Sequence, residues 1–177
     1  MEHSHVYEFG DIILQPLYNT DIENLRVLRN KEKEYFTTQN EITREMQKEW
    51  YKKYLKKNDD IMFRIVKKAD PERFIGAIAL YDIDWQNKIC EFGRIMVDKG
   101  LAPEKGIGLQ AAKAVCLFGF EELKMEKIIC VVLKTNARVI KVYDRAGFHI
   151  VGENDNLYNM EITYSDLMDA EYKMRNT

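Results

Sequence analysis

Two glycines one residue apart, Gly106 and Gly108, stand at the start of a long apolar segment and could bring the backbone close to an anion. The first N–H groups of a helix lack intrahelical partners and carry a partial positive charge, and glycine lets a phosphate approach them closely. Lys105 adds a positive charge just before the pair. The stretch "LAPEKGIGLQAAKAVCLFGF" therefore predicts either a phosphate-binding helix start or a simple turn.

Two common phosphate-binding motifs do not account for this stretch. A P-loop counted from Gly100 would need glycine at position 105, where the chain has lysine. The dinucleotide pattern G-x-G-x-x-G/A matches Gly106, Gly108 and Ala111. That pattern should directly follow a strand and precede an acid by about 20 residues, and neither condition holds here. The dinucleotide interpretation is therefore disfavoured.

A second group of residues that could do chemistry lies in "KTNARVIKVYDRAGF". Asn136 predicts a helix N-cap, and Gly147 predicts the residue that ends the helix, with Phe148 placed for the accompanying apolar contact. Asn136 and Tyr143 are seven residues apart, which is two helical turns, so they share one helix face. Taken alone, Tyr143 is expected to be a packing residue.

The two stretches together, with a strand between them, resemble the acetyl-CoA motif of the GNAT N-acetyltransferase superfamily. The family's loop is written Q/R-x-x-G-x-G/A, and a helix, a strand and N-x-x-A/V-x-x-x-Y-x-x-x-G-F follow it. The strand "EFGRIMVD" precedes the loop, and the resemblance covers essentially the whole chain. It departs from the family at Pro103, which stands at the Gln/Arg position and removes one expected donor to the pyrophosphate. Lys105 could compensate.

The resemblance implies that acetyl-CoA is the co-substrate and that its acetyl group passes directly to a primary amine in a ternary complex. Backbone amides of the strand before the loop would stabilise the oxyanion, the loop would hold the pyrophosphate, and Asn136 would contact the pantetheine arm. The implied cofactor-binding residues are Ile95, Met96, Val97, Lys105, Gly106, Ile107, Gly108, Leu109 and Asn136.

Two residues are candidates for proton transfer. Tyr143 would protonate the thiolate of CoA, as the resemblance implies. Glu91, which begins the strand before the loop, is the candidate base, and a water chain is the alternative. Strict alternation would keep Glu91 on one strand face with Gly93, Ile95 and Val97. Loss of solvent near the acceptor would raise the pKa of Glu91 toward neutrality.

Residues that contact the acceptor are expected in the first two helices and the segment after the first, where the family keeps its specificity. The candidates are Arg29, Asn30, Glu32, Tyr35, Phe36 and Trp50. The stretch "LRVLRNKEKEYF" resembles subgroups that acetylate amino groups on nucleotide-linked sugars. A small-molecule amine, such as an amino sugar, is therefore the expected acceptor.

Other acceptors and one other class of function remain open. Within the enzyme class, the alternative acceptors are polyamines, aminoglycosides and protein N-termini. A polyamine site needs clustered acids, and six candidates lie in residues 20–47: Asp21, Glu23, Glu32, Glu34, Glu41 and Glu45. The alternative outside the enzyme class is a catalytically silent regulatory module that binds CoA. Such a module is expected to have lost Tyr143 or the glycines, and both are present.

The elements that must position these residues alternate along the chain. Strands are expected at 11–17, 61–68, 73–84, 89–98 and 127–134, and helices at 19–30, 41–57, in the glycine-led stretch and at 136–148. Residues 149–174 predict two further strands joined by a polar turn. The class is mixed α/β or α+β. The resemblance implies a GNAT fold, a mostly antiparallel sheet of about seven strands with about four flanking helices, splayed between the parallel strands at 91–97 and 127–133.

Composition sets the remaining expectations. The 27 basic and 29 acidic residues give a net charge of −2, which provides no electrostatic reason to expect nucleic acid or a membrane as partner. No repeat or linker interrupts residues 1–177, so we expect one domain, a monomer or homodimer. Three dispersed cysteines in apolar surroundings predict buried thiols and a cytoplasmic protein. No metal site is expected; the terminal Met-Glu-His could chelate copper or nickel, although an unstructured end is expected.

Overall fold

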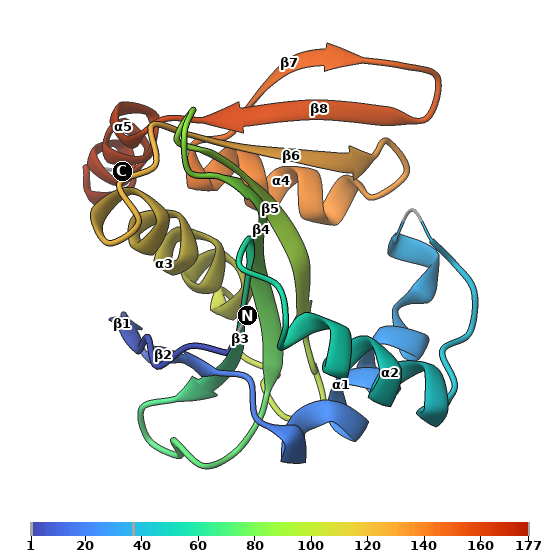
Figure 1. Ribbon diagram of the computed structural model, residues 1–177. Helices are drawn as coiled ribbons and strands as arrows, with labels where there is room; N and C mark the ends of the chain where they lie inside the picture. The colour runs from blue at the N-terminus through green and yellow to red at the C-terminus, as the bar shows by residue number, and fades with distance from the viewer. Residues whose placement is uncertain (1, 37, 177) are drawn as a thin grey trace.

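The computed structural model describes residues 2–36 and 38–176, which fold into a mixed sheet covered by helices (Figure 1). The strands are β1 (Tyr7–Phe9), β2 (Ile12–Pro16), β3 (Asp60–Lys67), β4 (Gly76–Asp84), β5 (Ile89–Val97), β6 (Lys127–Leu133), β7 (His149–Glu153) and β8 (Leu157–Ile162). The α-helices are α1 (Ile22–Lys31), α2 (Arg44–Tyr54), α3 (Ile107–Glu121), α4 (Ala137–Ala146) and α5 (Tyr164–Arg175). The short 3-10 helices η1 (Asn19–Asp21) and η2 (Lys33–Tyr35) flank α1.

The strand order is β1-β2-β3-β4-β5-β6-β8-β7, and every neighbouring pair is antiparallel except β5 and β6. This parallel pair is in register only over Ile89–Glu91 and Lys127–Ile129. Beyond Glu91 the two strands diverge, as Figure 1 shows. The expected fold class, with its splayed central parallel pair, is confirmed.

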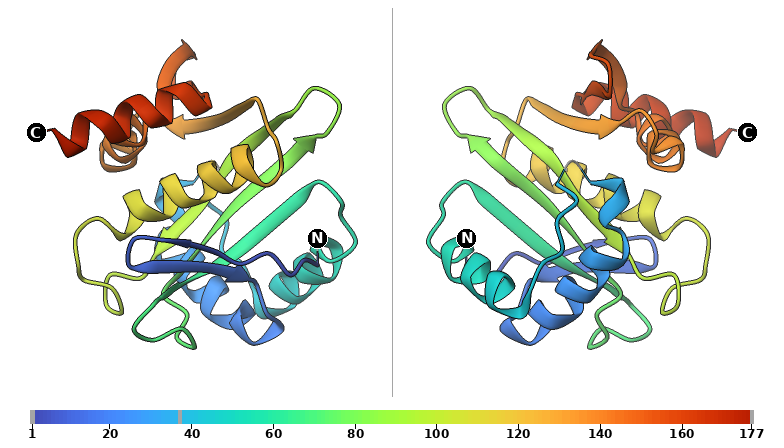
Figure 2. Two further views of the ribbon diagram at one scale, coloured as in Figure 1. Left: turned by 90° about the vertical axis from the view of Figure 1, so that its left-hand side faces the viewer. Right: turned by 90° about the vertical axis from the view of Figure 1, so that its right-hand side faces the viewer.

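Helices cover both faces of the sheet. Helix α3 lies on one face and contacts β1, β2, β4, β5 and β6, while α1 contacts β4 and β5 from the other face (Figure 2). The apolar side chains of α3 pack into the larger core, in which Phe63 and Phe118 meet with ring centroids 5.0 Å apart. Cys90, Cys116 and Cys130 lie in the same core and are buried and free, which confirms the expectation of buried thiols.

A β-bulge interrupts β5 in the middle. Just after Gly93, β5 contains one residue more than the segment of β4 opposite it. Arg94 at the bulge has φ +52°, in the left-handed region. The extra residue reverses the strand faces, so that Ile95 and Val97 pack against the α3-side core while Glu91 lies with Tyr81 on the other face. The expectation that strict alternation holds from 91 to 97 is therefore wrong.

The C-terminal region differs from the expected pair of strands. Strands β7 and β8 form as expected, but α5 follows them and begins at a capping box in which Thr163 and Asp166 bind each other's backbone N–H groups. Buried Lys113 on α3 forms a 2.5 Å ion pair with Glu171, which ties α5 to the core. Within the described residues the sheet therefore has eight strands where about seven were expected, and five α-helices where about four were expected.

The N-terminal segment forms no helix or strand before Tyr7, but His3 packs against β3, so the expectation of an unstructured end is wrong at His3; Met1 lies outside the described residues. The His3 Nε2 atom is 3.0 Å from the Met62 carbonyl oxygen, and the ring meets Phe63 edge-on at 4.9 Å. No helix among the described residues is long and apolar enough to cross a bilayer.

Candidate active site

A cavity of about 990 Å³ lies where β5 and β6 diverge. Its walls come from α1, the segment after it, α2, β3, β4, β5, β6, the start of α3 and one face of α4. The predicted catalytic residues Glu91 and Tyr143 both line it. Of the predicted cofactor-binding residues, Ile95, Met96, Val97, Gly108 and Asn136 line this cavity, and Lys105, Gly106, Ile107 and Leu109 do not.

The two glycines at the start of α3 differ in backbone conformation. Gly106 is the N-cap with φ +99°, a conformation that favours glycine. Gly108 has no such conformation, and a Cβ atom added at either position would meet nothing within 4 Å. The first α3 hydrogen bond runs from the Gln110 N–H to the Gly106 carbonyl at 2.9 Å, so the N–H groups of residues 107–109 precede it. The helix start is therefore open and can receive an anion.

Two further basic residues line the cavity, and the sequence analysis missed both. They are Lys99, which follows β5, and Arg138, in the first turn of α4. Burial and the positive charge of Arg138 lower the pKa of Lys99, and the Glu32 carboxylate partly opposes this effect. Lys105 and Pro103 are exposed and do not line the cavity. A pyrophosphate at the start of α3 would accept from the free N–H groups, and the two cations would add positive charge to the same cavity.

Asn136 and Tyr143 lie on one face of α4, as predicted, and both line the cavity. The Asn136 side chain caps the helix by accepting from the Val139 N–H at 3.2 Å. The helix ends at Gly147, whose φ is +111°, and the Phe148 N–H donates to the Tyr143 carbonyl at 3.0 Å. The predicted caps are therefore confirmed, and they fix the face of α4 that meets the cavity.

Tyr143 is almost completely buried, with 5% of its surface exposed. Its ring packs edge-on against Phe92, with centroids 4.9 Å apart, and lies 5.5 Å from Phe148. Burial raises the pKa of Tyr143 well above its ordinary value. Within the described residues its hydroxyl makes no hydrogen bond. The phenol is held rigidly and keeps its proton, which is the form that a general acid requires.

Glu91 is held by a tyrosine that the sequence analysis did not identify. The Tyr81 hydroxyl donates a 2.6 Å hydrogen bond to Glu91 Oε1. Burial raises the pKa of Tyr81 well above its ordinary value, and the Glu91 carboxylate adds to this effect. A Cβ atom on Gly93 would lie 2.8 Å from the Tyr81 hydroxyl oxygen, so glycine at this position leaves room for the pair.

The same tyrosine contacts Arg94 at the bulge. The Arg94 guanidinium lies over the Tyr81 ring at 4.1 Å and forms an ion pair with buried Asp60 at 2.8 Å. Cross-strand partners such as these depend on strand register. The sequence pattern alone could not predict these contacts, because it does not determine the register of the strands.

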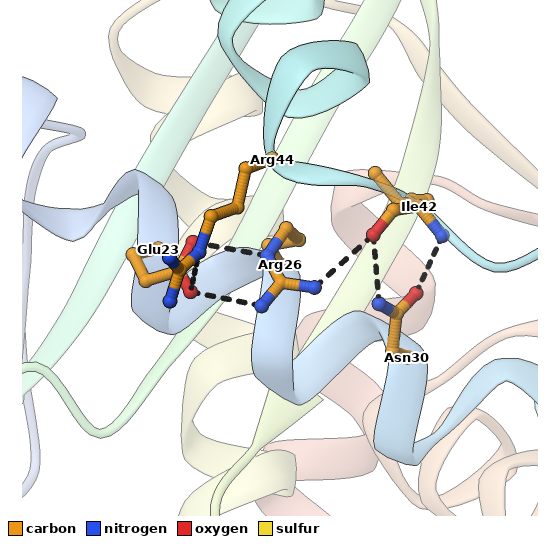
Figure 3. A network of polar contacts seen from close by, with 5 residues as sticks. All are labelled: Glu23, Arg26, Asn30, Ile42 and Arg44. Carbon is orange, nitrogen blue, oxygen red and sulfur yellow. Dashed lines mark hydrogen bonds and ion pairs between the residues drawn. The ribbon is translucent and has the colours of Figure 1, made fainter.

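Five of the six predicted acceptor-side residues line the cavity: Arg29, Glu32, Tyr35, Phe36 and Trp50. Asn30 is not among the lining residues. Its amide accepts from the Ile42 N–H at 2.8 Å and donates to the Ile42 carbonyl at 2.9 Å (Figure 3). Asn30 therefore fixes the segment between α1 and α2, in which Ile42 itself lines the cavity.

Ion pairs reinforce this segment, as Figure 3 shows. Arg26 donates to both carboxylate oxygens of Glu23, at 2.8 and 2.9 Å, and to the Ile42 carbonyl at 3.2 Å. Arg44, at the start of α2, donates to the same Glu23 at 3.1 Å. The network therefore joins α1, the connecting segment and α2 along the acceptor side of the cavity.

The chain resembles known N-acetyltransferases in sequence. The family model described as "Acetyltransferase (GNAT) domain" matches residues 11–149. The probable N-acetyltransferase YjcK of Bacillus subtilis (strain 168) is 29% identical over 150 residues, which is 80% of this chain and 82% of that protein. Spermidine N(1)-acetyltransferase of Escherichia coli (strain K12) is 32% identical over 93 residues, or 51% of this chain and 47% of that enzyme.

Solved structures agree on the fold. Apo FdhC, described as a nucleotide-linked sugar GNAT, superposes with a TM-score of 0.82 at 21% identity, over 98% of each chain. The spermidine N-acetyltransferase of Vibrio cholerae, solved in complex with CoA and spermine, superposes with a TM-score of 0.78 at 21% identity, over 89% of this chain and 98% of that one. From its matching family model and its N-acetyltransferase relatives, the chain belongs to the GNAT N-acetyltransferase family.

Proposed function

We propose that this protein transfers the acetyl group of acetyl-CoA to the primary amine of an amino sugar, free or linked to a nucleotide. The observation that carries the proposal is a single cavity lined by Gly108 at the open start of α3, by Tyr143 and by Glu91. The cavity thus joins an anion-binding helix end to an acid and a base, which is what acetyl transfer from a thioester needs.

The chain offers a site for each part of acetyl-CoA. The N–H groups of residues 107–109 would hold the pyrophosphate, with Lys99 and Arg138 supplying positive charge. Asn136 would face the pantetheine arm from the start of α4. Because β5 has no register with β6 beyond Glu91, those of its later amides that do not point toward β4 are open toward the cavity. Acetyl-CoA supplies the activated acetyl group as a thioester.

The proton transfers follow from the positions of three groups. Glu91, directly or through water, takes a proton from the acceptor ammonium, and the neutral amine then attacks the thioester carbon. Met96 pairs with Ala77 of β4, so the N–H groups of Ile95 and Val97, on the other edge of β5, stabilise the negative oxygen that forms. The carbon–nitrogen bond forms and the carbon–sulfur bond breaks. Tyr143 gives its proton to the departing thiolate.

The charges of the cavity support a sugar acceptor over a polyamine. Of the six acids in residues 20–47, Glu32 is the one that lines the cavity. Asp21 is instead buried beside Arg64, at 3.6 Å, and Glu23 is bound by Arg26 and Arg44. The resemblance to spermidine acetyltransferases makes polyamine acetylation the second candidate.

The proposal is tested by measuring CoA release from acetyl-CoA in the presence of amino sugars, nucleotide-linked amino sugars, spermidine, aminoglycosides and N-terminal peptides. Turnover of an amino sugar, free or nucleotide-linked, with a kcat/KM at least tenfold above that of spermidine supports it. Preferred turnover of spermidine supports the polyamine alternative. Measurable CoA binding without turnover of any amine contradicts the proposal and supports a silent CoA-binding module.

A further inference from the structure

Arg29 is a cation on the acceptor side of the cavity without an anionic partner. Its guanidinium carbon lies 3.7 Å from the centroid of the Phe36 ring, and Nη2 donates to the Thr38 carbonyl. Its Nη1 is buried and has no hydrogen-bond partner among the described residues. No described carboxylate lies within ion-pair distance of this guanidinium. The neighbouring Arg26, by contrast, is paired with Glu23 at 2.8 Å.

This arrangement is costly for the protein without a ligand. A buried N–H donor without an acceptor costs about 1–3 kcal/mol, and more when the group is charged. Burial also lowers the pKa of Arg29, and no neighbouring carboxylate opposes that effect. Stacking on Phe36 covers one face of the guanidinium, and the Arg29 side chain lines the cavity, where a ligand can meet its N–H groups. Arg29 is therefore preorganised to donate to an anion.

The other cations that line the cavity either have a carboxylate partner or are assigned to acetyl-CoA. Arg94 forms an ion pair with Asp60. Lys99 interacts electrostatically with Arg138 and with the Glu32 carboxylate, and the proposed function assigns Lys99 and Arg138 to the phosphates of acetyl-CoA. Arg29 stands instead on α1, with the aromatic side chains of Phe36 and Trp50 in the same wall.

We propose that Arg29 binds a phosphate group of the acceptor, so that the substrate is an amino sugar bearing phosphate. This inference rests on the proposed function and narrows its acceptor class. The planar guanidinium donates to phosphate oxygens in a fixed geometry. The aromatic side chains offer an apolar surface to a sugar or base ring. A polyamine has only positive charges and would be repelled by Arg29.

The kinetic test compares acceptors that differ in one phosphate: glucosamine against glucosamine 6-phosphate, with a UDP-linked amino sugar and spermidine beside them. We expect Arg29→Gln to raise the KM of phosphate-bearing acceptors by about tenfold or more, which corresponds to about 1.4 kcal/mol. The KM for acetyl-CoA and the kinetics of glucosamine should change by less than about threefold. Lys31→Gln, which removes a charge from the same helix outside the cavity, is the matched control.

A binding measurement separates this inference from the proposed function. With CoA saturating its own site, glucosamine 6-phosphate and UDP are titrated calorimetrically into the wild type, Arg29→Gln and Arg29→Lys. Binding that Arg29→Gln weakens about tenfold and Arg29→Lys partly restores supports the phosphate site, even if no amine is acetylated. Equal binding by the three proteins, or no binding of either probe, overturns it.

Discussion

Tyr81 on β4 donates a 2.6 Å hydrogen bond to Glu91 on β5, and both residues line the cavity. Gly93, two residues farther along β5, leaves the space that the tyrosine hydroxyl occupies. The candidate base is thus positioned by a neighbouring strand. The hydrogen bond fixes the orientation of the carboxylate in the cavity.

Replacing Tyr81 by Phe should therefore lower kcat/KM by about tenfold throughout the pH profile, because the candidate base loses the hydrogen bond that orients it. The measurement is a pH series of steady-state rates. In a Glu91→Gln background the same replacement should have little further effect, because the carboxylate is already lost. Tyr51→Phe, at a partly buried tyrosine outside the cavity, is the matched control. An unchanged profile would remove Tyr81 as a positioning residue.

Replacing Tyr143 by Phe should lower kcat by about one to three orders of magnitude, because the thiolate loses its proton donor. The ring contacts with Phe92 and Phe148 would remain, so acetyl-CoA binding should change little. Steady-state kinetics and calorimetry with acetyl-CoA measure the two effects separately. Wild-type turnover in this variant would exclude the role of general acid.

Replacing Asn30 by Ala should release the segment between α1 and α2, because both hydrogen bonds to the Ile42 backbone are lost. We expect the acceptor KM to rise by about tenfold while the acetyl-CoA KM stays within about threefold. Lys31→Gln, next to Asn30 on α1, is the control. Equal increases in both KM values would indicate general damage to the fold in place of a local effect on the acceptor side.

His3 should make stability depend on pH. Burial lowers its pKa from 6.5 to about 4. Between these two values the unfolded chain binds a proton that the folded chain does not, so stability rises with pH across this window and is lost as pH falls. After allowance for solvent screening, the effect is about 1–2 kcal/mol.

Urea unfolding of the wild type and His3→Gln at pH 7 and pH 4.5 measures this effect. The wild type should lose more stability than the variant on acidification. His149→Gln, at a half-exposed histidine on β7, serves as the control. An identical pH response of the wild type and His3→Gln would contradict the contribution of His3.

Much of the site was predictable because its motif residues lie within single local elements. Asn136, Tyr143 and Gly147 occupy one helix, so their spacing alone determined a shared face and two caps. The glycines at the start of α3 were likewise predictable, because they lie within one short stretch of sequence. The parts that the sequence could not predict depend on register or backbone geometry. The bulge at Arg94 has a left-handed non-glycine residue, and the Tyr81–Glu91 pair needs two aligned strands.

The missed helix α5 had a local sequence signal. Thr163 and Asp166 form the capping box that begins it, and the pattern T-x-x-D was present in the sequence. The alternating segment before it favoured strands over the whole region. Asn30 illustrates the opposite case: its place on α1 was predicted correctly, but its backbone partner Ile42 lies 12 residues away, and only the folded chain brings them together.

The central claim is that acetyl-CoA binds with its pyrophosphate at the start of α3, and Gly108→Leu tests it most directly. The family pattern accepts glycine or alanine at this position, so a larger side chain is needed to block the site. No described residue outside α3 and the chain neighbours of Gly108 lies within 4 Å of an added Cβ atom, and leucine favours a helix, so the variant should be at least as stable as the wild type without ligand. The decisive measurement is calorimetric titration with acetyl-CoA. We predict a Kd at least about tenfold weaker than that of the wild type, since the side chain occupies the approach to the N–H groups. Unchanged affinity in the folded variant would contradict the claim.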